Sequence, residues 1–147
     1  MPVLAPNASE YFAFRLANAG NCTWVLSFEQ HRGAGDLHLV TWGCAQGTAT
    51  SSGMHPTFSK FAGLSPPPGG GQYTRELQFA SCHNNGTGDQ VVSLGKMATV
   101  TAGTGSAYYQ FSPQVTLHSQ ETLTYVKGAG FTVFDSSGLP KSSSSHS

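Results

Sequence analysis

Residues 11–28, YFAFRLANAGNCTWVLSF, contain two short segments in which every second residue is apolar. The alternating apolar positions are Phe12, Phe14, Leu16, Trp24, Leu26 and Phe28. A period of two places these side chains on one face of a β-strand. The segment Asn18-Ala19-Gly20-Asn21 between them has the residue types that hairpin turns require for positive φ. With a third segment at residues 37–42, the first 44 residues are predicted to form a three-stranded antiparallel meander.

Short alternating segments recur through the second half of the chain, about ten residues apart. They cover residues 73–80, 90–94, 97–101, 107–111, 114–118, 122–126 and 131–134. The composition agrees with strands, because the chain has 18 glycines and only 10 % charged residues, and is poor in the residues that favour helices. The sequence therefore predicts an all-β protein, an antiparallel β-sandwich or jelly roll of about nine or ten short strands.

The strand pattern weakens between residues 43 and 71, where the segment Pro66-Pro67-Pro68-Gly69-Gly70-Gly71 ends any regular structure. We expect one long loop excursion there, and loops of this length are often functional. Residues 1–8 are predicted to be a linker or N-terminal extension, and residues 9–135 a single β-sandwich domain. Residues 136–147 have nothing to bury and are predicted to be a disordered Ser-rich tail.

The charge and motif content argues against several functional classes. A formal net charge of zero gives no field to attract nucleic acid, and no apolar run is long enough for membrane insertion. The amino end has no signal peptide pattern. The chain lacks the common catalytic and nucleotide-binding motifs, and its 3 cysteines and 6 histidines follow no recurrent ligand spacing. We therefore expect no enzymatic activity, no metal and no cofactor; a hydrolase with a dispersed site is disfavoured by the scarcity of carboxylates.

An uncharged surface rich in Ser, Thr, Asn, Gln and Gly packs readily against copies of itself. This character is typical of the projecting domains of viral capsid proteins, of fibre heads and of many lectins. The features together favour a non-enzymatic attachment module on a virion surface or in an extracellular setting. Such a module would self-associate as a dimer or trimer and bind a host-cell glycan or protein receptor. The alternative is a carbohydrate-binding lectin, in which an aromatic ring stacks on the sugar.

Candidate site residues follow from this hypothesis, since loops at one end of a sandwich carry binding while the sheets hold them in place. The predicted receptor-binding residues are His83, Asn84, Asn85, Thr87 and Asp89 in a turn, and Phe58 and Phe61 in the excursion. Tyrosines tolerate half-wet positions and are enriched at interfaces. The predicted oligomer interface contains Tyr73, Tyr108, Tyr109 and Tyr125.

Overall fold

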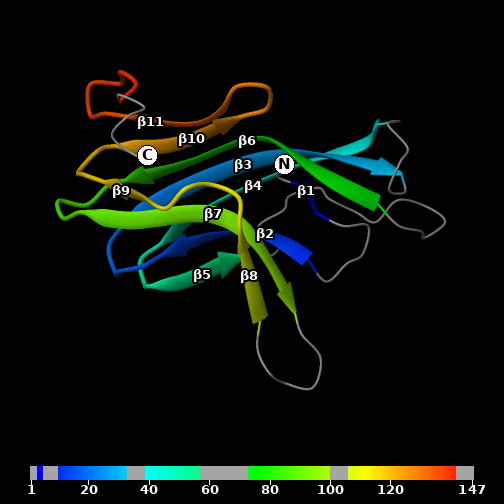
Figure 1. The fold of residues 1–147 in the computed structure, drawn as a ribbon, viewed down its shortest axis with the longest axis horizontal. Coiled ribbons are helices and arrows are strands. Elements are labelled where there is room, and N and C mark those ends of the chain that lie inside the picture. Colours follow the sequence, from blue (N-terminus) through cyan, green and yellow to red (C-terminus); the bar gives the residue numbers. More distant parts are fainter. Residues whose placement is uncertain (1–2, 5–9, 33–38, 57–72, 100–105, 142–147) are drawn as a thin grey trace.

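The computed structural model describes residues 3–4, 10–32, 39–56, 73–99 and 106–141. Eleven strands in these residues form two antiparallel sheets (Figure 1). Sheet A has the order β11 (Gly130–Phe134), β10 (Thr122–Val126), β6 (Tyr73–Asn84), β3 (Cys22–Arg32) and β4 (Leu39–Ala49), with β1 (Val3–Leu4) also paired to β6. Sheet B has the order β5 (Gly53–Pro56), β2 (Glu10–Leu16), β7 (Gln90–Thr99) and β8 (Ser106–Gln110), with β9 (Val115–Leu117) also paired to β7.

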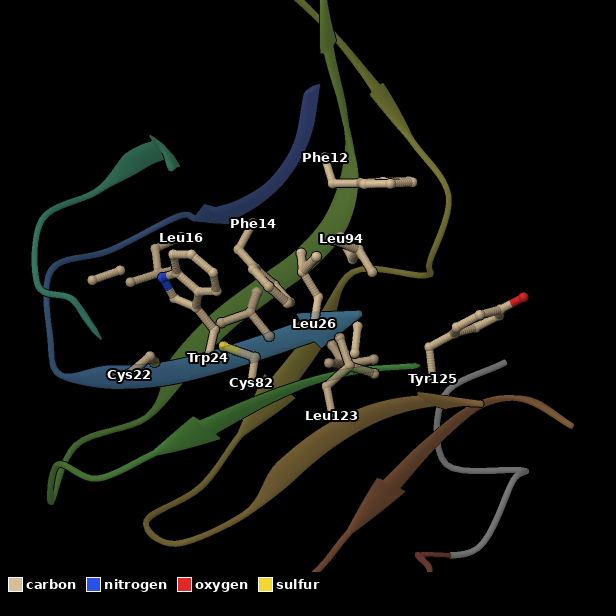
Figure 2. Packing of buried hydrophobic residues seen from close by; sticks show 14 of the residues in the cluster. Phe12, Phe14, Leu16, Cys22, Trp24, Leu26, Cys82, Leu94, Leu123 and Tyr125 are labelled. Atoms are coloured by element: carbon tan, nitrogen blue, oxygen red, sulfur yellow. The ribbon is translucent and has the colours of Figure 1, made fainter. Parts of the chain in front are cut away.

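The core lies between the inner faces of the two sheets, so the all-β sandwich prediction is confirmed. Alternation along β2 and β3 places the predicted apolar set inward, and all six side chains are buried. Figure 2 shows five of them, Phe12, Phe14, Leu16, Trp24 and Leu26, in the core. The two strands meet across the core, where the ring centroids of Phe14 and Trp24 lie 5.8 Å apart and those of Phe12 and Phe28 lie 6.0 Å apart. Among the described residues, no helix is long and apolar enough to cross a membrane.

The meander prediction is wrong in its first strand. β3 and β4 do form an antiparallel pair, but β2 pairs with β5 and β7 in the opposite sheet. Residues 17–21 therefore carry the chain from one sheet to the other. The physical reason is that β2 and β3 each have one apolar face, and packing these faces against each other buries both.

The loop excursion predicted for residues 43–71 begins too early. Residues 43–49 belong to β4, and β5 follows at Gly53–Pro56. Small residues hid this strand, because the large partner comes from β3: a Cβ on Gly47 would lie 2.7 Å from the Trp24 ring. Phe58 and Phe61 lie outside the described residues.

The division into strands at residues 90–94 and 97–101 is also wrong, since β7 continues through Gly95 and Lys96. Gly95 is buried, and a Cβ there would lie 2.3 Å from the carbonyl oxygen of Tyr109 and 2.7 Å from the Tyr108 ring. This glycine permits the close approach of β8 and does not make a turn.

Both ends of the chain contain more structure than the sequence indicated. Within the expected linker, Val3–Leu4 pairs with Arg75 and Glu76 of β6. Residues 136–141, expected to be part of a disordered tail, form a turn after β11. The Asp135 carboxylate accepts hydrogen bonds from the backbone N–H groups of Ser137 and Leu139, at 2.9 and 3.0 Å. These bonds are local, and Lys141 N–H fastens the end of the turn to β11 by donating to the Val133 carbonyl at 2.7 Å.

Candidate functional site

Several connections meet at one end of the sandwich, on the left in Figure 1. We call residues 17–21, 84–89 and 118–121 together the loop end. Backbone hydrogen bonds join them: Asn85 N–H donates to the Asn21 carbonyl at 2.9 Å, and Gln120 N–H donates to the Asn84 carbonyl at 2.8 Å. The predicted receptor-binding turn therefore lies among segments from three parts of the chain.

Asn84 holds this turn from inside. Its side chain is fully buried, and its amide nitrogen donates to the carbonyls of Gly88 at 2.8 Å and Leu117 at 2.9 Å. Its amide oxygen accepts from Gly86 N–H at 2.9 Å. Asn84 was predicted to contact a receptor, but a side chain with no exposed surface fixes the loop instead. The reason is its position at the end of β6, where alternation turns it toward the core.

A second buried amide, Gln90, ties the residue 17–21 connection to β7. Its nitrogen lies 3.0 Å from the Ala19 carbonyl and 3.3 Å from that of Asn18, and its oxygen accepts from the Cys22 thiol at 3.3 Å. The amide sits beneath Gly20, where a Cβ would approach it to 2.2 Å. Buried polar groups are costly unless bonded, so these contacts favour one geometry of the loop end.

His83 connects the loop end to the outer face of sheet A. Its Nδ1 lies 2.7 Å from Thr122 Oγ1, and its Nε2 lies 3.0 Å from Gln120 Oε1. Because an amide oxygen only accepts, Nε2 is the donor and Nδ1 accepts from the threonine hydroxyl in the neutral ring. Gln120 has a φ of 66°, a left-handed conformation that non-glycine residues adopt uncommonly. The bonds to His83 and Asn84 offset the cost of that conformation.

An imidazole and a carboxylate lie side by side on the exposed rim of the loop end. His118 Nδ1 donates to Asp89 Oδ1 at 2.8 Å, and the two side chains are 57 % and 60 % exposed. Such an exposed pair contributes little to stability. Because both side chains are exposed, a ligand can reach them. Below it, the buried carboxylate of Glu121 accepts from His118 N–H at 2.9 Å and from Lys141 Nζ at 3.2 Å.

The exposed side chains of the rim are all polar and form hydrogen bonds through amides, a hydroxyl, an imidazole and a carboxylate. They are Asn85, Thr87, Asp89, His118 and Gln120. These groups suit hydrogen bonding to sugar hydroxyls or to the backbone of a peptide. No group of three or more His, Cys, Asp and Glu side chains suited to a metal ion occurs in the described part of the chain.

The structure separates the predicted interface tyrosines. Tyr109 is 54 % exposed, with Lys96 Nζ 5.7 Å from its ring centroid. Tyr108 is half-buried over Gly95 on the other face of β8, with its hydroxyl 2.8 Å from Ser93 Oγ. Tyr73 begins β6, and its side chain lies outside the description.

Tyr125 was predicted to lie at the interface, and this is wrong. It is 6 % exposed and belongs to the core, with its ring centroid 4.8 Å from that of Phe131. The physical reason is that alternation in β10 turns Tyr125 inward with Leu123, leaving Thr124 and Val126 outward.

The three cysteines divide into a buried pair and an exposed thiol. Cys22 and Cys82 share the inner face of sheet A. Their mutual hydrogen bond lowers the pKa of Cys22, and the same bond with burial raises the pKa of Cys82 well above its usual value. Cys44 is exposed on β4.

Sequence reasoning missed Gln90, His118 and Gln120 as parts of the loop end. Gln90 had a usable signal, because a period of two places it on the same face as Val92 and Leu94. His118 and Gln120 had none, since they reach the turn only through the pairing of β9 with β7 and of β10 with β6.

No family model matches the chain, and no curated protein or solved structure matches it.

Proposed function

We propose that this chain is a non-enzymatic attachment module, the projecting domain of a viral capsid protein or a fibre head. It self-associates on a virion or other extracellular surface and binds a host receptor through the rim of the loop end. The observation that carries the proposal is the construction of that rim. Exposed, mostly uncharged polar side chains surround a turn that two buried amides, Asn84 and Gln90, hold in place.

Pre-organisation is what a binding loop requires. A loop that is already ordered loses less conformational entropy when it binds, so more of the contact energy appears as affinity. The bonds of Asn84 reach both ends of its own turn and the neighbouring β9. The rim groups that remain exposed are therefore presented by a fixed backbone.

The outer face of sheet A supports the self-association part of the proposal. Phe79 and Val126 are direct cross-strand partners, 38 % and 44 % exposed, and Val25 on the neighbouring β3 is 37 % exposed. Around them lie uncharged side chains, among them Ser27, Thr124 and Ser81, on strands paired in register. The nearest charges, Lys127 and Glu76, pair with each other at 3.2 Å, so the patch sets no unpaired charge against a second copy.

Two matched arginine variants test the attachment role. Thr87→Arg changes an exposed position on the rim, and Ala129→Arg changes an exposed turn at the far end of β10. Labelled domain should bind a panel of cultured cells, with T87R weaker by at least tenfold and A129R equal to the natural chain. Equal binding by T87R would refute the rim as the site, and no binding to any cell type by the natural chain would refute attachment.

A lectin is the second candidate, and one arrangement favours it. Phe134, Thr122 and His83 are successive cross-strand neighbours on the outer face of sheet A, beside the rim. A half-buried ring next to a hydroxyl and an imidazole suits a sugar, which stacks on the ring and hydrogen-bonds the polar groups. On a glycan array the natural chain should then bind one sugar class, and Phe134→Leu should lose that binding while its urea midpoint stays near that of the natural chain. Binding unchanged by F134L would refute this arrangement.

A further inference from the structure

The feature that carries a further inference is the outer edge of sheet A at β4. Leu39–Ala49 pairs with β3 and, within the described strands, with no other. The strand is 11 residues long, and its sequence LVTWGCAQGTA contains no charged residue and no proline. Its second edge is a row of backbone donors and acceptors, which is a template for pairing with another strand.

The remaining sheet edges carry the devices that natural proteins use against such pairing. At β11 the chain folds back, with Phe134 bridged to Pro140 and Lys141 N–H donating to the Val133 carbonyl at 2.7 Å. β5 has only 4 residues and ends at Pro56, and β8 has only 5. Short strands and prolines protect edges from further pairing. β4 has a register shift at its start, where Val40 is left out of the pairing with β3, but its regular part from Thr41 to Ala49 is longer than these edges and has no proline. This part of the edge is therefore suited to pairing with a further strand.

We infer that β4 pairs antiparallel with β4 of a second copy of this chain, joining two copies of sheet A into one continuous sheet. A two-fold axis at Cys44, the central residue of Leu39–Ala49, pairs the regular part of the strand with its copy. Thr41 then faces Gly47 of the copy. An antiparallel pair of this length supplies about six to eight hydrogen bonds, within the range found in a standard interface.

The partner is a second copy because the edge is complementary to itself. The neutral strand sets no charge against its own copy, whereas a foreign strand would need charges or pockets to be selected. The exposed side chains of Cys44, Gln46 and Thr48 lie on one face, so the outer face at the centre of the joined sheet carries no charge. This inference rests on the proposed self-association and specifies the surface that mediates it.

The pairing predicts a reporter at its centre. Directly opposite residues of antiparallel strands have Cα atoms about 4.5 to 5.5 Å apart, within the range that a disulfide spans. Diamide, a thiol oxidant, should therefore link Cys44 to its copy: two thiols lose two electrons and two protons to the diamide, which becomes the hydrazine. Cys44→Ser should abolish the linked dimer. In a C44S/Q46C variant the new thiol faces residue 42 of the copy and should link at least tenfold more slowly.

Solution mass provides the second test, by light scattering after size exclusion over a wide concentration range. The natural chain and C44S should have twice the chain mass of 15.4 kDa. Cys44→Lys places two like charges directly opposite at the two-fold axis and should raise the dissociation constant about tenfold or more. Circular dichroism verifies that C44K is folded, and the cross-linking test does not depend on that variant.

The outcomes separate the two proposals. A natural chain that stays monomeric at every concentration would refute both the β4 pairing and the proposed self-association. A stable oligomer that C44K leaves intact, or in which C44S/Q46C links as fast as the natural chain, would refute the β4 pairing alone. Self-association would then use another surface, such as the outer face around Phe79.

Discussion

Replacing Asn84 by alanine is the sharpest test of how the loop end is held. The side chain makes three hydrogen bonds, at 2.8 Å to the Gly88 carbonyl, 2.9 Å to the Leu117 carbonyl and 2.9 Å from Gly86 N–H. Each contributes about 1 kcal/mol net, and leaving a buried partner unsatisfied costs about 1 kcal/mol or more in addition. Asn84→Ala should therefore lower the free energy of unfolding by about 3 to 4 kcal/mol.

The neighbouring residue offers a matched control. Asn85 is exposed and its side chain makes one hydrogen bond, at 2.9 Å to Thr23 Oγ1. Asn85→Ala should cost less than about 0.5 kcal/mol, as surface substitutions usually do. The energetic difference between these two adjacent asparagines follows from burial and from the number of side-chain hydrogen bonds, three for Asn84 and one for Asn85.

Urea unfolding followed by circular dichroism measures both variants. The midpoint should fall strongly for N84A with an unchanged slope, since the same surface becomes exposed. At this chain length the corresponding melting temperature should drop by roughly 6 to 16 °C. A loss below about 1 kcal/mol for N84A, or equal losses for N84A and N85A, would refute the buried-amide account of the loop end.

Three further predictions follow from packing, exposure and ionisation. Gly95→Ala should lower the free energy of unfolding in urea by about 2 kcal/mol or more, because its Cβ would overlap the backbone of β8. Gly88→Ala, with open space around the added Cβ, should leave that free energy unchanged. In native buffer a thiol reagent should react quickly with Cys44 alone, and all three thiols should react after unfolding. Fast reaction of all three in the native protein would contradict the burial of Cys22 and Cys82. Burial raises the pKa of Tyr108, so its contribution to stability is fully present below the ordinary tyrosine pKa of about 10 and is lost as the pH rises through the folded value. Urea midpoints should accordingly decline above about pH 10, and Tyr108→Phe should make that decline shallower.

The predictions that failed share one cause, which is that pairing partners are distant in the sequence. β2 has the alternation of a meander strand, yet its partners β5 and β7 lie on opposite sides of the long segment 57–72 in the chain. The second half of β4, residues 43–49, lacked a visible pattern because Gly47 is small where Trp24 is large. Tyr125 reads as amphipathic in isolation, and its burial follows from which face of β10 turns inward and from the packing of Phe131 against it.

The loop end shows the same division between local and distant information. The turn from His83 to Asp89 was evident from its asparagines and glycines, because turn chemistry is local. Which of its side chains face outward was not evident. Asn84 is buried because β9 supplies the Leu117 carbonyl to its amide, and Asp89 stands beside His118 because the β9–β10 connection lies there.

The sequence by itself determined that this protein is all-β, with an apolar face on each strand and polar turns, because alternation and turn residues act over a few positions. The tertiary structure decided which sheet each strand joins, which amides are buried and which edge has no partner among the described strands. Those properties depend on contacts between residues about 30 to 70 positions apart, such as Asn84 with Leu117 and Gln90 with Cys22. The local sequence pattern does not predict such contacts, because the contact partner of each residue is fixed only when the two sheets pack together.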